Sequence, residues 1–320
     1  MRVGITHTTK LSYGTHVVEG VMDVRLGPRS DPDQRWQEYD LRARPNAAIR
    51  RYYDGFGNTA HLVTIARPHE EVELVSSAVV ETLLDDPFRL PLVPPAPLGP
   101  SELADYLSTS VIVPADPALK ALALPFKPAT PGETLESVQG LMGLVYREFQ
   151  YEPHVTTVAT TVPEVLKGRT GVCQDFAHVL IGLCRAIGLP ARYVSGYIVP
   201  RQAARTVQQA MPGTLAQSMG TMSQSLTFGE PMGRQTISAR PSDGVPEPSR
   251  GAGASHAWVE VFTPTHGWRG FDPTNNLLAS THHVKMGIGR DYNDVPPTRG
   301  TFRGLAEEKL TVEVVARVLD

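Results

Sequence analysis

The chain contains few cysteines, no long apolar run and no excess of basic residues. Only two cysteines, Cys173 and Cys184, occur in 320 residues, which excludes a disulfide framework as the source of stability. No apolar stretch approaches the roughly 18 residues that a membrane-spanning helix needs. The first residues also lack the charged start and apolar centre of a secretion signal. We therefore expect a cytoplasmic protein that does not contact a membrane.

Charge and metal-ligand patterns argue against two further classes of partner. The formal net charge is −3, without the basic footprint that a phosphate backbone attracts, so we expect no nucleic acid. Four histidines, His256, His266, His282 and His283, could suggest a metal site. Adjacent histidines on a strand point to opposite faces, however, and no HExxH or paired-cysteine motif accompanies them. We expect neither a metal ion nor another cofactor, and the sequence leaves the oligomeric state open.

The N-terminal part of the chain has the pattern of a small antiparallel β domain. Apolar and polar residues alternate in β-branched runs through residues 1–85, and DGFGN supplies a turn between two of them. Prolines then crowd residues 86–130. We interpret that stretch as a surface linker with one short helix at SELADYL. The chain is long enough for a second, larger domain, which we place at residues 131–320.

The second domain is expected to mix helices and strands. Apolar residues at helical spacing predict helices over residues 135–149, 161–169 and 172–187. Runs of β-branched and aromatic residues predict strands at residues 191–200, 256–262, 268–272 and 309–318. Between the first two of these strands, residues 201–253 are rich in Gly, Ser, Gln, Met and Pro. That composition predicts a flexible insertion.

Cys173 stands at a position where a cysteine can react. It falls in the first turn of the helix predicted over residues 172–187, after Gly171. A helix N-terminus favours the thiolate form and offers unpaired N–H groups to the oxyanion of a tetrahedral intermediate. Most lone cysteines are buried core residues instead, and Cys184 on the apolar face of the same helix fits that interpretation. The two are too far apart along this helix to form a disulfide.

His256 and Asp272 can supply the base that a thiol needs and the group that orients this base. They lie on two predicted strands joined by a turn at about residues 263–267. A connection of three or five residues would place both side chains on one face, within reach of each other. A four-residue connection would place them on opposite faces. Taken alone, each residue could equally be an exposed strand histidine or a turn aspartate.

Three blocks of the sequence, GVCQDFAH, SHAWVEVF and GWRGFDPTN, surround these residues in this order. Together they resemble the transglutaminase-like superfamily, which comprises thiol enzymes with a Cys-His-Asp triad on a papain-like core. The flanking N-terminal sequence resembles the β-rich region that bacterial members carry. The resemblance implies an α+β fold in which helices pack on an antiparallel sheet, preceded by an N-terminal antiparallel β domain.

The resemblance also implies the roles of the three residues. Cys173 would be the nucleophile, His256 the general base and acid, and Asp272 the residue that orients the imidazole. The implied chemistry is a cysteine acyl-enzyme formed from a peptide or glutamine amide. Hydrolysis, as in a cysteine peptidase or amidase, or transfer to an amine would follow, and the expected partner is a peptide or protein substrate. The alternative is a non-catalytic peptide-binding module on the same fold.

Three more residues and one segment belong to this interpretation. Tyr151 is a candidate oxyanion donor by its position alone, while Asp175 and Trp258 resemble supporting members of the same blocks. Residues 201–253 are longer than the corresponding connection usual in bacterial relatives and end next to His256. They would form either a lid over the acyl site or an inert insertion, and composition alone favours neither.

Overall fold

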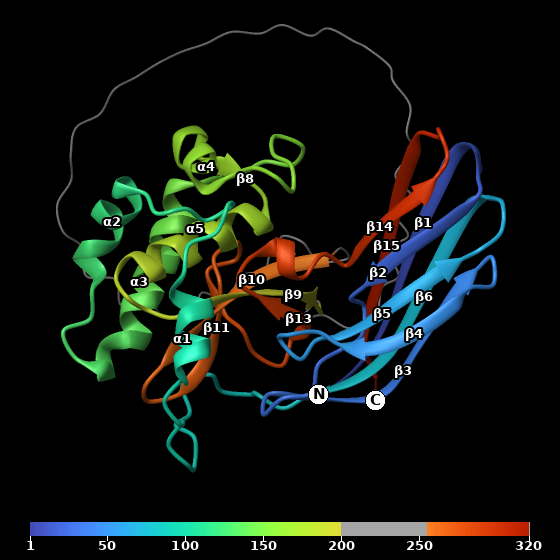
Figure 1. Ribbon diagram of the computed structural model, residues 1–320. Helices are drawn as coiled ribbons and strands as arrows, with labels where there is room; N and C mark the ends of the chain where they lie inside the picture. The colour runs from blue at the N-terminus through green and yellow to red at the C-terminus, as the bar shows by residue number, and fades with distance from the viewer. Residues whose placement is uncertain (200–254, 320) are drawn as a thin grey trace, which may run out of the picture. The chain divides into compact units, whose positions relative to one another are not determined.

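The computed structural model describes residues 1–199 and 255–319. Those residues form an α+β fold, with β strands at both ends of the chain and a mixture of helices and strands between them (Figure 1). Every sheet of three or more strands is antiparallel in its pairings. This is the fold class that the sequence indicated.

Two four-stranded sheets form the N-terminal β region. The first has the order β15-β1-β6-β3, with β1 (Arg2–Val17), β3 (Gln34–Arg44), β6 (His69–Thr82) and β15 (Glu308–Leu319). The second has the order β14-β2-β5-β4, with β2 (Glu19–Val24), β4 (Ala48–Tyr53), β5 (Thr59–Ile65) and β14 (Thr298–Arg303). Leu11 and Leu74 from the first sheet meet Met22 and Val63 from the second in one buried apolar cluster. Alternation of apolar residues along each strand therefore builds the core of this region.

The last two strands correct the predicted domain division, which assigned residues 131–320 to the second domain. β15 pairs with β1 along its length, and β14 pairs with β2, so both belong to the N-terminal β region (Figure 1). Alternation specifies which face of a strand is buried, but it does not specify which other strand supplies the hydrogen bonds. The long strand β1 needs partners along both edges, and residues from the far end of the chain satisfy one of them.

The proline-rich stretch 86–130 is also more structured than predicted. The expected short helix is α1 (Pro100–Leu107), and a second helix, α2 (Pro117–Ala123), follows it. Asp116 caps α2 with its side chain, and the proline after it stands in the first turn, where proline is favoured rather than disruptive. Leu119 of α2 is buried in the core of the second domain, so this part of the stretch is not a surface linker.

The second domain is built on a five-stranded sheet of order β12-β11-β10-β9-β13. Its strands are β9 (Ala191–Ile198), β10 (Ser255–Thr263), β11 (Gly267–Asp272), β12 (Leu277–Leu278) and β13 (His283–Gly289). The helices α3 (Thr134–Glu148), α4 (Val162–Gly168) and α5 (Cys173–Ala186) lie close to their predicted positions. Ala257, Val259 and Val261 of β10 share a buried cluster with α5, so α5 covers one face of the sheet. The short elements are β7 (Gln150–Tyr151), β8 (Thr170–Gly171), η1 (Leu124–Phe126), η2 (Pro131–Glu133) and η3 (Tyr292–Asp294).

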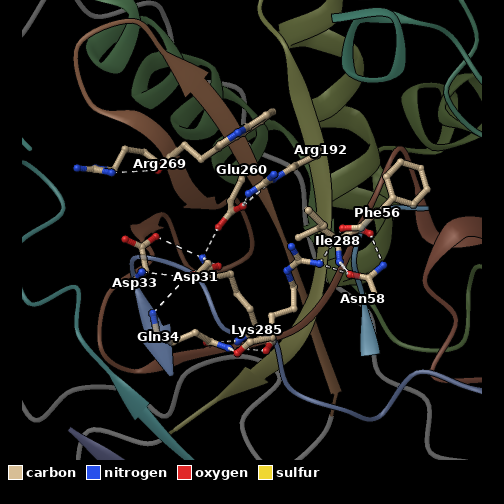
Figure 2. A network of polar contacts seen from close by, with 12 residues as sticks. Asp31, Asp33, Gln34, Phe56, Asn58, Arg192, Glu260, Arg269, Lys285 and Ile288 are labelled. Atoms are coloured by element: carbon tan, nitrogen blue, oxygen red, sulfur yellow. Dashed lines mark hydrogen bonds and ion pairs between the residues drawn. The ribbon is translucent and has the colours of Figure 1, made fainter. Parts of the chain in front are cut away.

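The edge strand β13 is completed by two amide side chains from the N-terminal β region. Gln34 donates to the carbonyl of Lys285 and accepts from its N–H, each at 2.8 Å. Asn58 does the same at Ile288, again at 2.8 Å in both directions (Figure 2). Each amide thus takes the place that a neighbouring strand would occupy, and the edge is left without unpaired groups at these positions.

A buried ionic network lies next to this edge strand, around Lys285 of β13 (Figure 2). The Nζ atom of Lys285 lies 2.5 Å from Asp31 Oδ2, 3.3 Å from Asp33 Oδ2 and 2.9 Å from Glu260 Oε1. Arg192 completes the network 2.6 Å from Glu260. Burial lowers the pKa of Lys285, but the carboxylates outweigh it and hold this pKa above its ordinary value. The network ties β10 and β13 to the N-terminal β region.

Candidate active site

Cys173 opens helix α5, and the residues around it form the cap of that helix. Asp175 accepts hydrogen bonds at Oδ2 from the Val172 N–H at 2.8 Å and from the Thr156 hydroxyl at 2.7 Å. A Cβ on Gly171 would lie 2.7 Å from the same carboxylate oxygen, so this close approach requires glycine. Burial raises the pKa of Asp175 despite those two hydrogen bonds. Asp175 therefore acts on the helix start that carries the thiol.

The two cysteines have different surroundings. Both are free thiols; Cys173 is partly exposed, whereas Cys184 is fully buried. Burial raises the pKa of Cys184 far above its ordinary value. The sequence-based interpretation of Cys184 as a core residue is confirmed, and Cys173 is the thiol that a reagent can reach.

His256 and Asp272 meet as the three-residue connection predicted. Thr263 pairs directly with Gly267, which leaves three residues between the strands. His256 and Asp272 then share a face, and His256 Nε2 lies 3.0 Å from Asp272 Oδ2. Both side chains are completely buried. The condition on which the sequence analysis rested is therefore satisfied.

Asp272 is held by the turn that follows its strand. Its Oδ1 accepts from the N–H groups of Thr274 at 3.0 Å and Asn275 at 3.2 Å. Its Oδ2 accepts from the side-chain amide of Asn275 at 2.8 Å. Burial raises the pKa of Asp272, but His256 and His283 outweigh it and keep this pKa well below its ordinary range. The group is a fixed carboxylate surrounded by donors.

The imidazole of His256 is turned so that its two nitrogens face different groups. Burial lowers its pKa, while Asp272 and then the Cys173 thiol raise it, and the result is a pKa of about 10. Since Nε2 faces Asp272, Nδ1 is the nitrogen left for the thiol. Nδ1 is buried and makes no hydrogen bond of standard geometry in the described residues, although the thiol acts on the ring as a hydrogen-bond partner. Catalytic contacts often align only when substrate binds.

Trp258 forms a wall beside this pair. Its ring stacks on His256 with centroids 6.2 Å apart and an interplanar angle of 25°. The ring is fully buried, and a Cβ on Gly196 would lie 2.5 Å from it, so the neighbouring strand keeps a glycine there. Trp258 thus fixes the plane of the imidazole and excludes water from one side of it.

His283 is a member of the site that sequence reasoning missed. In the sequence, His282 and His283 suggest only metal ligands, and as neighbours on a strand they are expected to point to opposite faces. They do diverge: His282 Nδ1 lies 3.1 Å from the Val199 carbonyl, while His283 Nε2 lies 3.5 Å from Asp272 Oδ2. Only the pairing of β13 with β9 brings His283 to this face. No group of three or more His, Cys, Asp or Glu side chains in residues 1–199 and 255–319 is arranged to hold a metal ion.

The remaining predicted residue, Tyr151, lies near the helix start. It stands on β7, which pairs in parallel with β8 at Gly171. Its ring packs edge-on against Phe176 of α5 with centroids 6.2 Å apart. Its role as an oxyanion donor stays a prediction. The predicted insertion at residues 201–253 lies outside the described residues, and none of the helices that are described has the length and apolar character to cross a bilayer.

Comparisons with known proteins agree with this architecture. Residues 120–273 match the Transglutaminase-like superfamily, and residues 3–81 match the Bacterial transglutaminase-like N-terminal region. An uncharacterized protein of Mycobacterium bovis is 31% identical over 332 residues, covering 98% of this chain and 92% of its own length. One of Mycobacterium leprae is 27% identical over 316 residues, covering 98% and 97%. A crystal structure of a candidate cysteine protease from Cytophaga hutchinsonii superposes with a TM-score of 0.66 at 20% identity, covering 100% of this chain and 92% of that chain. This last likeness shows a common fold.

Proposed function

Because the chain belongs to the transglutaminase-like superfamily and carries its bacterial N-terminal region, we propose that it is a thiol enzyme with a catalytic triad of Cys173, His256 and Asp272. One observation carries the proposal: a buried imidazole bonded to a carboxylate through Nε2 keeps Nδ1 for the thiol at the start of α5. A structural histidine needs no such arrangement. Nucleophile, base and orienting group are the parts that covalent acyl transfer requires.

The first half of the reaction forms an acyl-enzyme. The Cys173 thiolate attacks the carbonyl carbon of a peptide or glutamine amide, and a C–S bond forms. The negative oxygen of the tetrahedral intermediate accepts hydrogen bonds from N–H groups in the first turn of α5, with the Tyr151 hydroxyl as a further candidate donor. The C–N bond then breaks while His256 gives its proton to the leaving amine. Asp272 stabilises the imidazolium and keeps its orientation.

The second half returns the thiolate. Water or an amine attacks the thioester carbonyl, His256 takes a proton from that nucleophile, and the C–S bond breaks. Water gives hydrolysis, as in a peptidase or amidase, and an amine gives transamidation. Both outcomes use the same triad, so the proposal is a thiol acyl-transfer enzyme acting on peptide or protein amides. The superposition with a candidate cysteine protease supports the hydrolytic branch.

The second candidate function is a peptide-binding module that has lost the chemistry. The complete set of Cys173, His256 and Asp272 counts against it, as does the burial of an ionised carboxylate beside an imidazole. A binding module gains nothing from the cost of burying these groups.

Selective alkylation separates the two functions. Iodoacetamide near pH 6, followed by peptide mapping, should label Cys173 rapidly and Cys184 hardly at all, because a thiolate reacts and a buried thiol does not. His256→Gln should slow the labelling of Cys173 at this pH. Equal and slow labelling of both cysteines in the unmodified protein would favour the binding module.

A further inference from the structure

We propose that His283 is a positioning residue for the reaction, whose imidazole holds the Asp272 carboxylate in the orientation that keeps His256 directed at Cys173. The inference rests on the proposed function and extends it by one residue. His283 touches neither the thiol nor any reacting atom in this scheme, so it acts through Asp272.

The contact joins two buried groups. His283 Nε2 lies 3.5 Å from Asp272 Oδ2, the oxygen that also accepts from His256 Nε2 at 3.0 Å. His283 is 7% exposed and Asp272 is fully buried. A distance of 3.5 Å is long for a hydrogen bond, but the site excludes the water that would otherwise screen the interaction. His283 also lowers the pKa of Asp272.

The turn before β13 sets the tautomer of His283. The backbone N–H of Ser280 donates to the ring nitrogen Nδ1 of His283 at 3.4 Å, and the backbone N–H of His283 donates to the Ser280 carbonyl at 2.9 Å. A ring nitrogen that accepts a hydrogen bond carries no proton, so the proton of the neutral imidazole is on Nε2. His283 therefore presents a donor to Asp272. The donor does not depend on a charge on the ring.

Three donors then converge on one oxygen of Asp272: His256, His283 and the Asn275 amide. Two of them approach from different strands, β10 and β13, while the third comes from the turn after β11. Hydrogen bonds from three directions restrict rotation of the Asp272 carboxylate away from the His256 imidazole. Losing the His283 donor weakens this hold and leaves Oδ2 of a buried carboxylate less completely satisfied, although the two N–H groups at Oδ1 remain.

The Trp258 ring contacts both His256 and His283. It stacks on His256 and meets His283 edge-on, with centroids 5.2 Å apart and an interplanar angle of 74°. The other charged group that β13 carries on this side is Lys285, whose charge is already paired with Asp31, Asp33 and Glu260. Asp272 is therefore the charged partner that His283 faces.

The test compares variants that differ in whether they keep the donor. His283→Phe keeps a ring of similar volume without an N–H, and His283→Gln places an amide N–H near the position of Nε2. His282→Phe, at the neighbouring residue, is the matched control. We expect His283→Phe to alkylate Cys173 about tenfold more slowly near pH 6, the effect of one hydrogen bond to a charged group. His283→Gln should restore most of the rate, and His282→Phe should match the unmodified protein.

The pH profile supplies a readout that packing alone does not move. Without this donor, Asp272 aligns less well with His256 and stabilises its imidazolium less, so the acid limb of the alkylation profile should move upward in His283→Phe but not in His283→Gln. Thermal unfolding verifies that each variant folds, and His283→Leu replaces His283→Phe if the ring does not fit. An unchanged rate in the donor-free variant, or equal losses in Phe and Gln variants, overturns the role of His283. Slow labelling of Cys173 in the unmodified protein overturns the proposed function itself, and this inference with it.

Discussion

Strand β10 carries two buried polar clusters on the same face, one around His256 and one around Glu260, four positions apart. They differ in how completely their polar atoms are paired. At Glu260, the network with Lys285, Arg192 and the two aspartates pairs each charge (Figure 2). None of its side-chain nitrogen or oxygen atoms is among the buried atoms without a partner in the described residues. Around His256, three buried polar atoms have no hydrogen-bond partner within residues 1–199 and 255–319: His256 Nδ1, Trp258 Nε1 and Thr274 Oγ1.

The difference matches the roles that we assign to the two clusters: the Glu260 cluster holds the fold, and the His256 cluster is the one proposed to perform chemistry. Buried polar groups in proteins are nearly always satisfied, and the exceptions concentrate where a ligand or a reaction completes the set. The Glu260 cluster connects β10 and β13 to the N-terminal β region, so we assign it a structural role. In the His256 cluster, Nδ1 of the imidazole is the nitrogen left for the Cys173 thiol in the mechanism that we propose.

The largest effect should come from Cys173→Ala. Removing the nucleophile should lower turnover on a peptide amide by at least about 10⁴-fold. The melting temperature should hardly change, because Cys173 is only partly buried and packs at the edge of the core. A continuous amide-release assay measures the first effect and calorimetry the second. Residual turnover near that of the unmodified protein would remove Cys173 from the mechanism.

Lys285→Met should do the opposite: it should lower the stability of the fold and leave the reactivity of Cys173 unchanged. It removes the cation that Asp31 and Asp33 share and leaves the buried Glu260 with Arg192 as its remaining partner, so the free energy of unfolding should fall by about 3 kcal/mol. Lys10→Met is the matched control, because Lys10 forms an exposed pair with Glu73 at 3.2 Å and should cost less than about 1 kcal/mol. Urea unfolding measures both. The contrast fails if the two variants are equally stable, or if folded Lys285→Met loses its rapid alkylation at Cys173.

Asp272→Asn should reduce turnover by about 10²-fold or more while the protein stays folded. The amide retains the shape of the carboxylate, but it can present a donor where His256 Nε2 needs an acceptor. Asp40→Asn, in an exposed pair with Arg42, is the control and should leave turnover unchanged. Equal activity in both variants would mean that Asp272 does not orient the imidazole.

The smallest effect is a pH dependence of stability that belongs to His256. Its pKa is raised from 6.5 to about 10, so its charged form stabilises the fold fully below about 6.5 and loses this contribution as pH rises towards 10. The unfolding free energies of the unmodified protein and His256→Gln should therefore converge by about 1–3 kcal/mol between pH 6 and 10. Comparing the two at each pH cancels groups that titrate in both. A constant difference would show that the pKa is not raised.

Local patterns predicted much of the fold and the three proposed catalytic residues. The helix start at Cys173, its end at Gly188 with a φ of 83°, and the three-residue connection between β10 and β11 all depend on nearby residues. Short-range spacing is sufficient for such features, since a helix or hairpin satisfies its own hydrogen bonds. The same locality made α1 visible in a proline-rich stretch.

Long-range partners were what the sequence could not supply. β15 reaches β1 from the far end of the chain, and Lys285 meets Asp31 and Asp33 across more than 250 residues. A lysine is expected at the surface, and no local pattern signals one that is 6% exposed. His283 was missed for the same reason, because its contact with Asp272 depends on sheet order. The Pro117 helix was missed because proline there starts a helix rather than ending one.

The most direct measurement is the mass of the protein trapped during turnover on a pool of peptides at low temperature. A thiol acyl-transfer mechanism at Cys173 requires an acyl adduct that maps to Cys173, is released by hydroxylamine as a thioester is, and is absent from Cys173→Ala. An adduct on Cys184, one that persists in Cys173→Ala, or amide turnover without any hydroxylamine-labile intermediate would contradict it.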